Sequence, residues 1–143
     1  MLNILFYILL CLATTLIMEI VAILTHKYIM HGPGWFLHKS HHENHDDTFE
    51  KNDFYFLIFS IPSILFISIG AMDINYTYLS IGVGILLYGL IYLFLHDMMV
   101  HKRFNKKYKI KNSYLKKVQR AHLIHHSNKN KDGGVHFGFI YYK

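Results

Sequence analysis

The chain has 143 residues, of which 52% are hydrophobic, 16% aromatic and only 17% charged, and it contains 12 histidines and a single cysteine. This length fits one domain, and the apolar composition excludes a disordered chain. The single cysteine excludes a disulfide framework and a cysteine-based zinc site. A formal charge of +6 would suggest a nucleic-acid partner if the basic residues covered a soluble face, but their positions indicate a membrane protein instead.

Three long apolar stretches predict an all-α integral membrane protein with about three transmembrane helices. They cover residues 1–24, 54–72 and 74–95. At about 1.5 Å per helical residue, each is long enough to cross a hydrocarbon core of roughly 30 Å. A cleaved signal peptide is the alternative for the first stretch, but a basic start and a small-residue cleavage site are both missing.

The second and third stretches are separated only by the residues around Asp73, which predicts a tight helical hairpin. Small residues let helix backbones approach each other closely. We therefore expect Gly82, Gly84 and Gly89 to lie at helix contacts.

All 15 lysines and arginines lie in residues 25–53 and 96–143. With three crossings these two segments fall on one side of the membrane, and the positive-inside rule predicts that this side is the cytoplasm. The basic residues are expected to contact anionic membrane lipids, and an acidic redox partner is a second possible use. Nucleic-acid binding is not expected, because no nucleic-acid-reading motif accompanies the basic run. That run is Lys102, Arg103, Lys106, Lys107, Lys109 and Lys111.

All 12 histidines lie in the same two segments, six in each, and ten of them form a pattern that occurs twice. Each half reads H-x4-H followed by H-x2-H-H. The first half consists of His26, His31, His38, His41 and His42, and the second of His96, His101, His122, His125 and His126.

Helical geometry predicts how each box is arranged. Residues at i, i+3 and i+4 lie within roughly 100° around a helix, so the three histidines of each H-x2-H-H box are expected to share a face. For the second box we expect a helix that starts near Tyr114 with Ser113 as its N-cap, with Lys116 and Lys117 opposite the histidines.

Histidines at i and i+5 are rotated by roughly 140° on an ideal α-helix and cannot face one centre. The pair His26 and His31 therefore needs a helix end or a π-bulge, and residues 32–34, Gly-Pro-Gly, supply a break. No comparable breaker follows His96 and His101, so we expect either a π-bulge there or two separate metals.

An isolated histidine is usually a packing or surface residue, but ten in two matched clusters predict a metal site. Imidazole suits Zn, Cu, Fe and Ni. Ten ligands are too many for one ion and suit two ions with about four or five nitrogens each. A structural zinc site closes itself with four ligands, so the excess indicates chemistry.

Two acids are candidates for orienting these ligands. Glu19 lies seven residues before His26 inside apolar sequence. An acid in such a segment costs free energy, so it is a candidate functional residue. We expect it to fix an imidazole tautomer, with a polar helix–helix contact as the alternative. Asp97 follows His96 and lies four residues before His101, so a similar role is expected, with an N-cap or surface acid as the alternative.

The two boxes resemble those of the membrane di-iron hydroxylase and desaturase superfamily. More narrowly, the sequence is similar to the bacterial β-carotene hydroxylases in residues 26–32, HKYIMHG, and in residues 137–139, FGF. Further matching stretches are Met18-Glu19, Ser40-His41-His42-Glu43, Asn52-Asp53, His96-Asp97, Val100-His101, Tyr114-Leu115-Lys116, Ala121-His122 and His125-His126. The resemblance runs from about residue 17 to the end of the chain.

The resemblance implies that the ten box histidines bind two non-haem iron ions, with O2 as co-substrate and reduced ferredoxin as electron donor. It implies a carotenoid substrate from the bilayer, with β-carotene converted through β-cryptoxanthin to zeaxanthin at the cytoplasmic side of the bacterial inner membrane. His45 matches a further family histidine. His136 stands where the family tends to have serine, and we interpret it as a surface histidine.

Two alternatives remain open at this point. One is a fatty-acyl or sterol hydroxylase or desaturase of the same superfamily, although the HKYIMHG string and the three-span chain favour a carotenoid. The other is a histidine-rich metal transporter or sensor. Transport sites lie near the bilayer midplane, whereas no histidine falls inside a predicted span.

Overall fold

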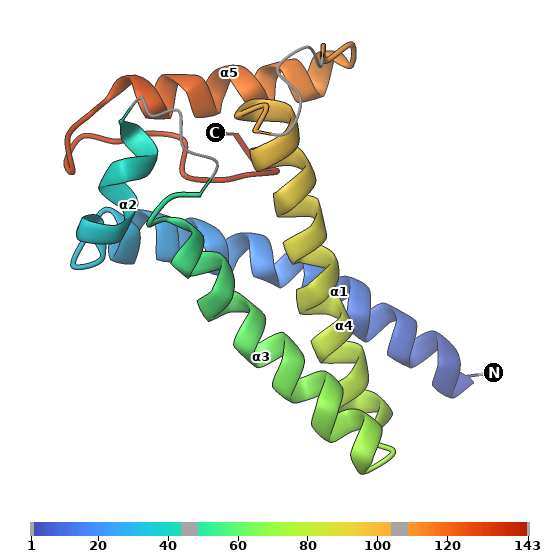
Figure 1. Cartoon of the computed structure of the whole chain (residues 1–143). Coiled ribbons are helices and arrows are strands. Elements are labelled where there is room, and N and C mark those ends of the chain that lie inside the picture. Colours follow the sequence, from blue (N-terminus) through green and yellow to red (C-terminus); the bar gives the residue numbers. More distant parts are fainter. Residues whose placement is uncertain (1, 44–48, 104–108, 143) are drawn as a thin grey trace. The chain divides into compact units, whose positions relative to one another are not determined.

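The computed structural model describes residues 2–43, 49–103 and 109–142, and every regular element in these ranges is helical. Three helical stretches, Leu2–Met30, Asp53–Met72 and Tyr76–Val100, are long and apolar enough to cross a membrane. The prediction of an all-α membrane protein is confirmed. In chain order the elements are α1 (Leu2–Leu24), the π-helix η1 (Thr25–Met30), α2 (Trp35–His42), α3 (Asp53–Met72), α4 (Tyr76–Tyr92), the π-helix η2 (Leu93–Val100) and α5 (Ser113–Ser127) (Figure 1).

The chain forms two compact units, which are described separately. Unit 1 consists of Met1–Met18 and Tyr55–Ile91, and unit 2 of Glu19–Phe54 and Tyr92–Lys143. Unit 1 therefore contains most of the apolar helical sequence. Unit 2 contains all the histidines.

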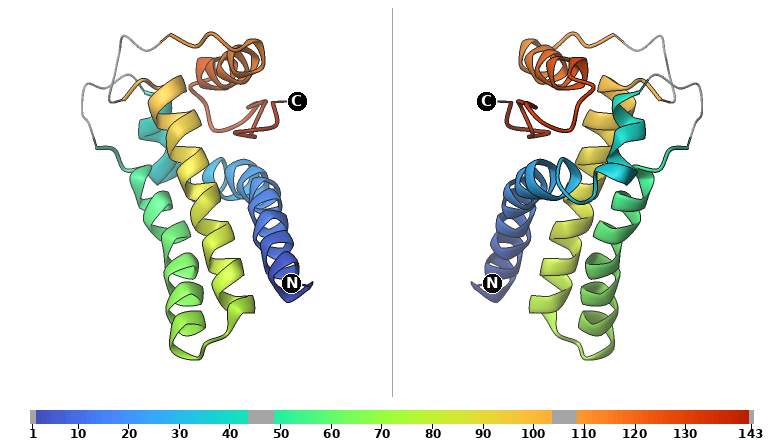
Figure 2. Two further views of the ribbon diagram at one scale, coloured as in Figure 1. Left: turned by 90° about the vertical axis from the view of Figure 1, so that its right-hand side faces the viewer. Right: turned by 90° about the vertical axis from the view of Figure 1, so that its left-hand side faces the viewer.

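In unit 1, α3 and α4 form the predicted hairpin and run side by side in both views of Figure 2. The turn needs a left-handed residue, which is Ile74 with φ 51°. Asn75 then caps α4, because its Oδ1 accepts hydrogen bonds from the backbone N–H groups of Thr77 (3.1 Å) and Tyr78 (3.2 Å). This cap explains why the helix begins at Tyr76 rather than at the predicted residue 74.

Two of the three predicted contact glycines lie where helices touch. A Cβ at Gly82 would come within 2.7 Å of the Ile67 backbone nitrogen, and one at Gly84 within 2.7 Å of the Cys11 carbonyl oxygen. Gly89 is different, because a Cβ there would meet nothing within 4 Å. The prediction of a close contact is therefore wrong for Gly89.

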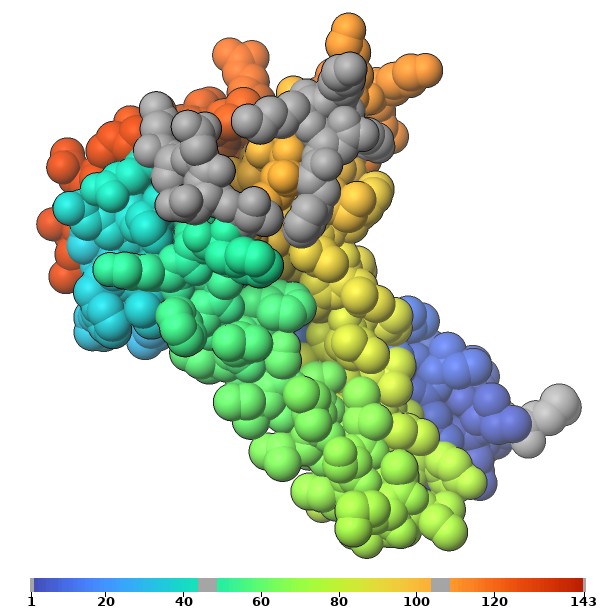
Figure 3. All heavy atoms as spheres, in the orientation of Figure 1, coloured from blue at the N-terminus to red at the C-terminus, as the bar shows by residue number. Residues whose placement is uncertain are grey.

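Gly89 instead borders an apolar groove of about 200 Å³ formed by α1, α3 and α4 within unit 1, with Met18, Phe59 and Ile85 among its lining residues. The lining serine Ser63 donates its hydroxyl proton to the Gly82 carbonyl (2.9 Å). The helix α3 lies at the surface on the face that Figure 3 draws (green), and many of its exposed side chains are large and apolar. Such a surface suits the bilayer. Examples are Leu57, Ile61 and Leu65.

In unit 2, both H-x4-H boxes adopt π-helical geometry. The His31 N–H donates to the His26 carbonyl (3.0 Å), and the His101 N–H donates to the His96 carbonyl (2.9 Å). These are i→i+5 hydrogen bonds, which add one residue to the turn and bring both histidines of a box toward one side. Of the alternatives that we considered for each box, the π-helical one is present in both.

The helix α5 packs against η2, and α2 packs against η1. Our assignment of the α5 cap is wrong by one residue. Asn112 is the N-cap, and its Oδ1 accepts from the Leu115 N–H (3.0 Å), whereas Ser113 is the first helical residue. The predicted separation of α5 into a buried side and an exposed side is present, with Val118 buried and Lys116 exposed.

Candidate metal centre

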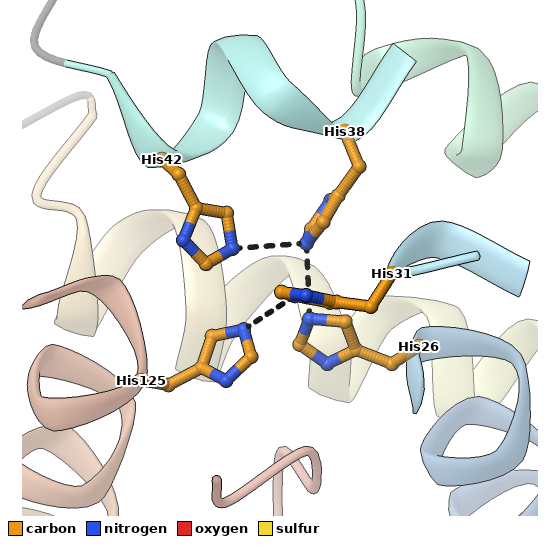
Figure 4. Close-up of side chains that lie close together, drawn as sticks. All are labelled: His26, His31, His38, His42 and His125. Carbon is orange, nitrogen blue, oxygen red and sulfur yellow. Dashed lines mark hydrogen bonds between the residues drawn. The ribbon is translucent and has the colours of Figure 1, made fainter. Parts of the chain in front are cut away.

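The ten box histidines form two clusters of five within unit 2. Each member offers one ring nitrogen, and the five nitrogens of a cluster lie within 4.8 Å of one another. All members of cluster A are buried, and in cluster B only His101 and His126 are half-buried. Cluster A consists of His26, His31, His38, His42 and His125 (Figure 4), and cluster B of His41, His96, His101, His122 and His126.

Each H-x2-H-H box is shared between the clusters. On α2, His38 and His42 face cluster A while His41 faces cluster B. The second box, on α5, makes the opposite division: His125 belongs to cluster A, and the outer pair belongs to cluster B. We predicted that the three histidines of a box would share one face of a helix. That face borders both clusters: two residues one turn apart belong to one cluster, and the intervening residue belongs to the other.

The two clusters adjoin each other. The rings of His42 in cluster A and His126 in cluster B are stacked with their centroids 4.5 Å apart. His96 and His101 lie in the same cluster, so the alternative that they serve two separate metals is wrong. Two neighbouring five-nitrogen sites match the expectation of four or five nitrogens per ion.

The Nε2 atoms converge on the centre of each cluster. In cluster A, His38 Nε2 lies 3.0 Å from His26 Nε2 and 3.2 Å from His42 Nε2 (Figure 4). In cluster B, His41 Nε2 lies 2.9 Å from His96 Nε2. Ligands at right angles to each other and about 2.1 Å from an ion lie about 3.0 Å apart, so these separations fit metal coordination.

Oxygen acceptors hold the other ring nitrogen of every cluster A histidine. Four of the five acceptors are backbone carbonyls of residues 128–137, part of the C-terminal segment (residues 128–142) that follows α5. A ring that donates Nδ1–H to oxygen leaves the Nε2 lone pair for a metal. The Nδ1 pairs are His26 with Phe137 O (2.9 Å), His31 with Lys131 O (2.8 Å), His42 with Asn128 O (2.9 Å), His125 with Val135 O (2.7 Å) and His38 with Asn52 Oδ1 (2.6 Å).

In cluster B, carboxylates take this role for two histidines. His41 Nδ1 lies 2.7 Å from Glu50 Oε1, and His96 Nδ1 lies 2.7 Å from Asp97 Oδ1. Asp97 therefore contacts the histidine beside it in sequence. Our expectation for Asp97 rested on its place near both His96 and His101 and did not choose between them.

The guanidinium of Arg103 joins these carboxylates. Its Nη2 donates to Asp53 Oδ2 (2.8 Å) and lies 3.5 Å from Glu50 Oε1, while its Nη1 lies 3.4 Å from Asp97 Oδ2. Sequence analysis missed Glu50 and Arg103, because neither lies in a histidine box. Asn52 and Asp53 belong to a stretch that resembles the family, but we assigned them no role.

Burial favours the neutral form of several cluster histidines outside the membrane-spanning helices. It lowers the pKa of His38 to about 2, of His125 to about 3 and of His42 to about 4. It also lowers the pKa of His41 and His122, and the neighbouring histidines add to the effect. A metal ligand must be an unprotonated imidazole. At neutral pH the site is therefore ready to bind a cation.

The chemistry of this donor set fits metal ions. Nitrogen lone pairs converge at 2.9–3.2 Å in two clusters that are mostly buried. The opposite ring nitrogens of all five cluster A histidines, and of His41 and His96 in cluster B, pair with oxygen. Without a cation, such lone pairs would repel one another in a poorly screened interior. Sulfur ligands are absent from the clusters, which leaves the metals that imidazole prefers, iron among them.

Comparison with known proteins places the chain in a family. The sequence pattern of the fatty acid hydroxylase family matches residues 11–142. The chain belongs to the fatty acid hydroxylase family. Among similar proteins, the β-carotene hydroxylase of Paracoccus sp. (strain PC1) is 43% identical over 130 residues, which are 90% of this chain and 80% of that protein. The β-carotene hydroxylase of Pantoea ananas is 44% identical over 128 residues, 90% of this chain and 73% of that protein. No solved structure matches.

Glu19 holds the C-terminal segment of this fatty acid hydroxylase in place. It is buried, and its Oε1 accepts hydrogen bonds from the backbone N–H groups of Phe139 (2.9 Å), Ile140 (2.8 Å) and Tyr141 (2.9 Å). A Cβ at Gly138 would clash with the Tyr141 backbone carbonyl oxygen and would lie 3.0 Å from this Glu19 oxygen, which explains the glycine of the FGF string. That Glu19 also orients an imidazole directly stays a prediction.

The remaining histidines differ from our expectations or lie outside them. His136 is half-buried with φ 58°, and its Nδ1 is buried without a hydrogen-bond partner among the described residues, so its interpretation as a surface histidine is wrong. His45 lies outside the described residues. The statement that no histidine falls inside a span also needs correction, because His26 and His96 lie in the end portions of the apolar helices Leu2–Met30 and Tyr76–Val100.

Proposed function

We propose that this membrane protein is a carotenoid 3-hydroxylase. It would add one hydroxyl group to each β-ionone ring, converting β-carotene through β-cryptoxanthin to zeaxanthin. The observation that carries the proposal is the pair of adjoining five-histidine clusters in a chain 43% identical to a β-carotene hydroxylase. We propose that the ten histidines bind two non-haem iron ions, and that Glu19 and Asp97 position the site.

Two iron ions would supply the activation of O2 that hydroxylation of an unactivated ring C–H bond requires. Each hydroxylation consumes one O2, two electrons and two protons, and releases one water. The chain itself orients the histidine ligands and shields the site from water. Acceptors on Nδ1 fix ring orientation, and burial excludes water from the reacting atoms. His42 and His125 are 0% exposed, in agreement with such a dry site.

The substrate is proposed to come from the bilayer. The apolar groove of unit 1 is lined by Phe56, Phe59 and Ile64 among others, and its serine hydroxyl Ser60 donates to the Phe56 carbonyl (2.7 Å). Because the serine hydroxyl groups of the lining already donate to backbone carbonyls, the groove suits a hydrocarbon better than a hydrogen-bonding ligand. We propose that this groove receives part of the hydrocarbon chain of the substrate.

Electrons are proposed to come from reduced ferredoxin on the cytoplasmic side of the bacterial inner membrane. The basic side chains Lys109, Lys111, Lys116, Lys117 and Arg120 are exposed in unit 2. Exposed positive charges steer an acidic partner toward them, and they also attract anionic lipids. This arrangement supports a ferredoxin-type partner and the predicted cytoplasmic location.

The test is pigment analysis in bacterial cells that accumulate β-carotene and contain ferredoxin. The wild-type chain should yield β-cryptoxanthin and zeaxanthin, and His42→Ala and His126→Ala should yield neither. The control is His136→Ser, which changes a histidine outside both clusters and should keep substantial activity. Full activity in the two cluster variants would refute the mechanism. Unchanged carotenoids together with hydroxylated fatty acids or sterols would support the alternative substrates, and metal accumulation without any product a transporter.

A further inference from the structure

The two histidine clusters have chemically different surroundings. Every acceptor recorded on a cluster A Nδ1 is neutral: four backbone carbonyls and the amide oxygen of Asn52. In cluster B, by contrast, the acceptors on His41 and His96 are the carboxylates of Glu50 and Asp97. An imidazole that donates to a carboxylate is a more basic ligand than one that donates to a neutral oxygen.

The charges around cluster B are poorly screened. Only 6% of the Glu50 side chain, 10% of Asp97 and 14% of Arg103 is exposed. With Asp53 included, three carboxylates face one guanidinium, which leaves an excess of negative charge beside cluster B among the residues that the structure describes. Among the described residues around cluster A, the charged groups Lys129 and Asp132 are exposed and opposite in sign, and the buried Glu19 accepts hydrogen bonds from the backbone N–H groups of residues 139–141. Screening by water weakens exposed charges far more than buried ones.

We propose that the two metal sites are unequal, with cluster B binding its ion more tightly and favouring the higher oxidation state. Cluster A then holds the ion that is reduced first. Arg103 is a positioning residue that aligns Glu50 and Asp97 against their histidines without touching the metal. This inference rests on the proposed two-ion centre and goes beyond it, because nothing in the repeated histidine pattern distinguishes the two halves.

The matched variants are Asp97→Asn and Asn52→Asp, each of which changes charge at one cluster with almost no change in size. Asp97→Asn keeps an oxygen near His96 Nδ1 but removes the negative charge from cluster B. Asn52→Asp places a negative charge against His38 Nδ1 in cluster A, where the present distance is 2.6 Å. Helix content by circular dichroism shows whether each variant is folded.

The measurement is Mössbauer spectroscopy of purified protein in mild detergent, loaded with the Mössbauer-active isotope of iron, together with total iron per chain. The wild type should hold two irons and give two distinct doublets of equal area. Asp97→Asn should shift one doublet and Asn52→Asp the other, and stepwise reduction should change the cluster A doublet first. Two irons with a single doublet, or variants that shift both doublets alike, would overturn the inference alone. Fewer than two irons in the folded wild type would overturn the proposed centre and the inference with it.

The role of Arg103 has its own readout. Arg103→Gln should release one of the two irons to a chelator about 10–100-fold more readily than the wild type, in line with other losses of an outer partner. Arg103→Lys should restore much of the retention, because it keeps the charge. The control Arg120→Gln removes an exposed arginine of α5 and should leave both irons in place. Unchanged retention in Arg103→Gln, or loss of both irons at the same rate, would refute this role.

Discussion

Replacing Glu19 by glutamine tests the connection between the first membrane helix and cluster A. In the wild type, one carboxylate oxygen accepts three backbone hydrogen bonds of 2.8–2.9 Å from residues 139–141. The adjoining Phe137 carbonyl accepts from His26 Nδ1 (2.9 Å), and the Phe139 ring stacks on the His26 ring. Glutamine keeps the size and an oxygen acceptor but removes the charge.

The magnitude follows from the three bonds. A hydrogen bond to a charged acceptor contributes about 1.5–3 kcal/mol and a neutral one about 0.5–1.5 kcal/mol, so each bond loses about 1 kcal/mol. Three such losses weaken the attachment of the C-terminal segment by about 3 kcal/mol. At about 1.4 kcal/mol per factor of ten, the detached population should rise roughly 100-fold. Glu19→Ala leaves three N–H groups without the acceptor and should have a larger effect.

The assay is amide hydrogen exchange by mass spectrometry on peptides that contain residues 139–141, with iron retention measured in parallel. Exchange in this segment should accelerate in Glu19→Gln and further in Glu19→Ala, and one iron, that of cluster A, should be lost preferentially. The control Glu43→Gln makes the same chemical change at an exposed acid whose ion pair with Lys39 lies on the surface.

Two results would refute this reasoning. Unchanged exchange in Glu19→Ala would mean that the three hydrogen bonds do not hold the C-terminal segment. Accelerated exchange with both irons retained would mean that the segment does not support cluster A through its carbonyls.

The remaining predictions concern the metal, the topology and the groove. Protein purified in mild detergent should hold close to two transition-metal ions per chain by elemental mass spectrometry, and His125→Ala should hold about one; two ions in that variant would contradict the cluster A assignment. Reporter fusions after Glu43 and at Lys143 should both report the cytoplasm, and one at Asp73 the opposite side; opposite reports from the first two would exclude a shared site. Gly89→Leu should fill the groove and raise KM for β-carotene with little change in kcat, and an unchanged KM would argue against the groove as a substrate site.

The sequence predicted much of the fold because its signals are local. Hydropathy identified three apolar helices, and the i, i+5 spacing of His26 and His31 predicted either a helix end or a π-bulge, of which the π-geometry is present. Helix ends were less predictable, since they depend on side-chain caps. Asn75 and Asn112 begin α4 and α5 at positions that apolar periodicity does not specify. Gly89 was misassigned because a glycine allows either a close contact or open space, and only packing decides between them.

The ten histidines of the site were predictable as a set, but their division was not. Spacing of three or four residues places side chains on one broad face of a helix, and that face turned out to border two sites. Whether His41 belongs with His38 or with His96 depends on what packs against α2. Segments that are far apart in the sequence meet there, such as α5 with its His125 and His126. The sequence alone does not reveal that they meet.

Most outer partners of the histidines, Asp97 excepted, were missed for a chemical reason. Metal binding requires that the ligand residue be a histidine, but the second ring nitrogen of that histidine can donate its hydrogen to any well-placed oxygen. The carbonyls of Lys131 and Val135 serve this purpose regardless of their side chains, so sequence cannot reveal them. Glu50 and Asp97 act through their side chains, and their carboxylates bring charge that a carbonyl would not. Substituting the residues that supply these oxygens should therefore disturb cluster B far more than cluster A, where four of the five acceptors are backbone carbonyls. Cluster A should respond mainly to changes that move the backbone of the C-terminal segment.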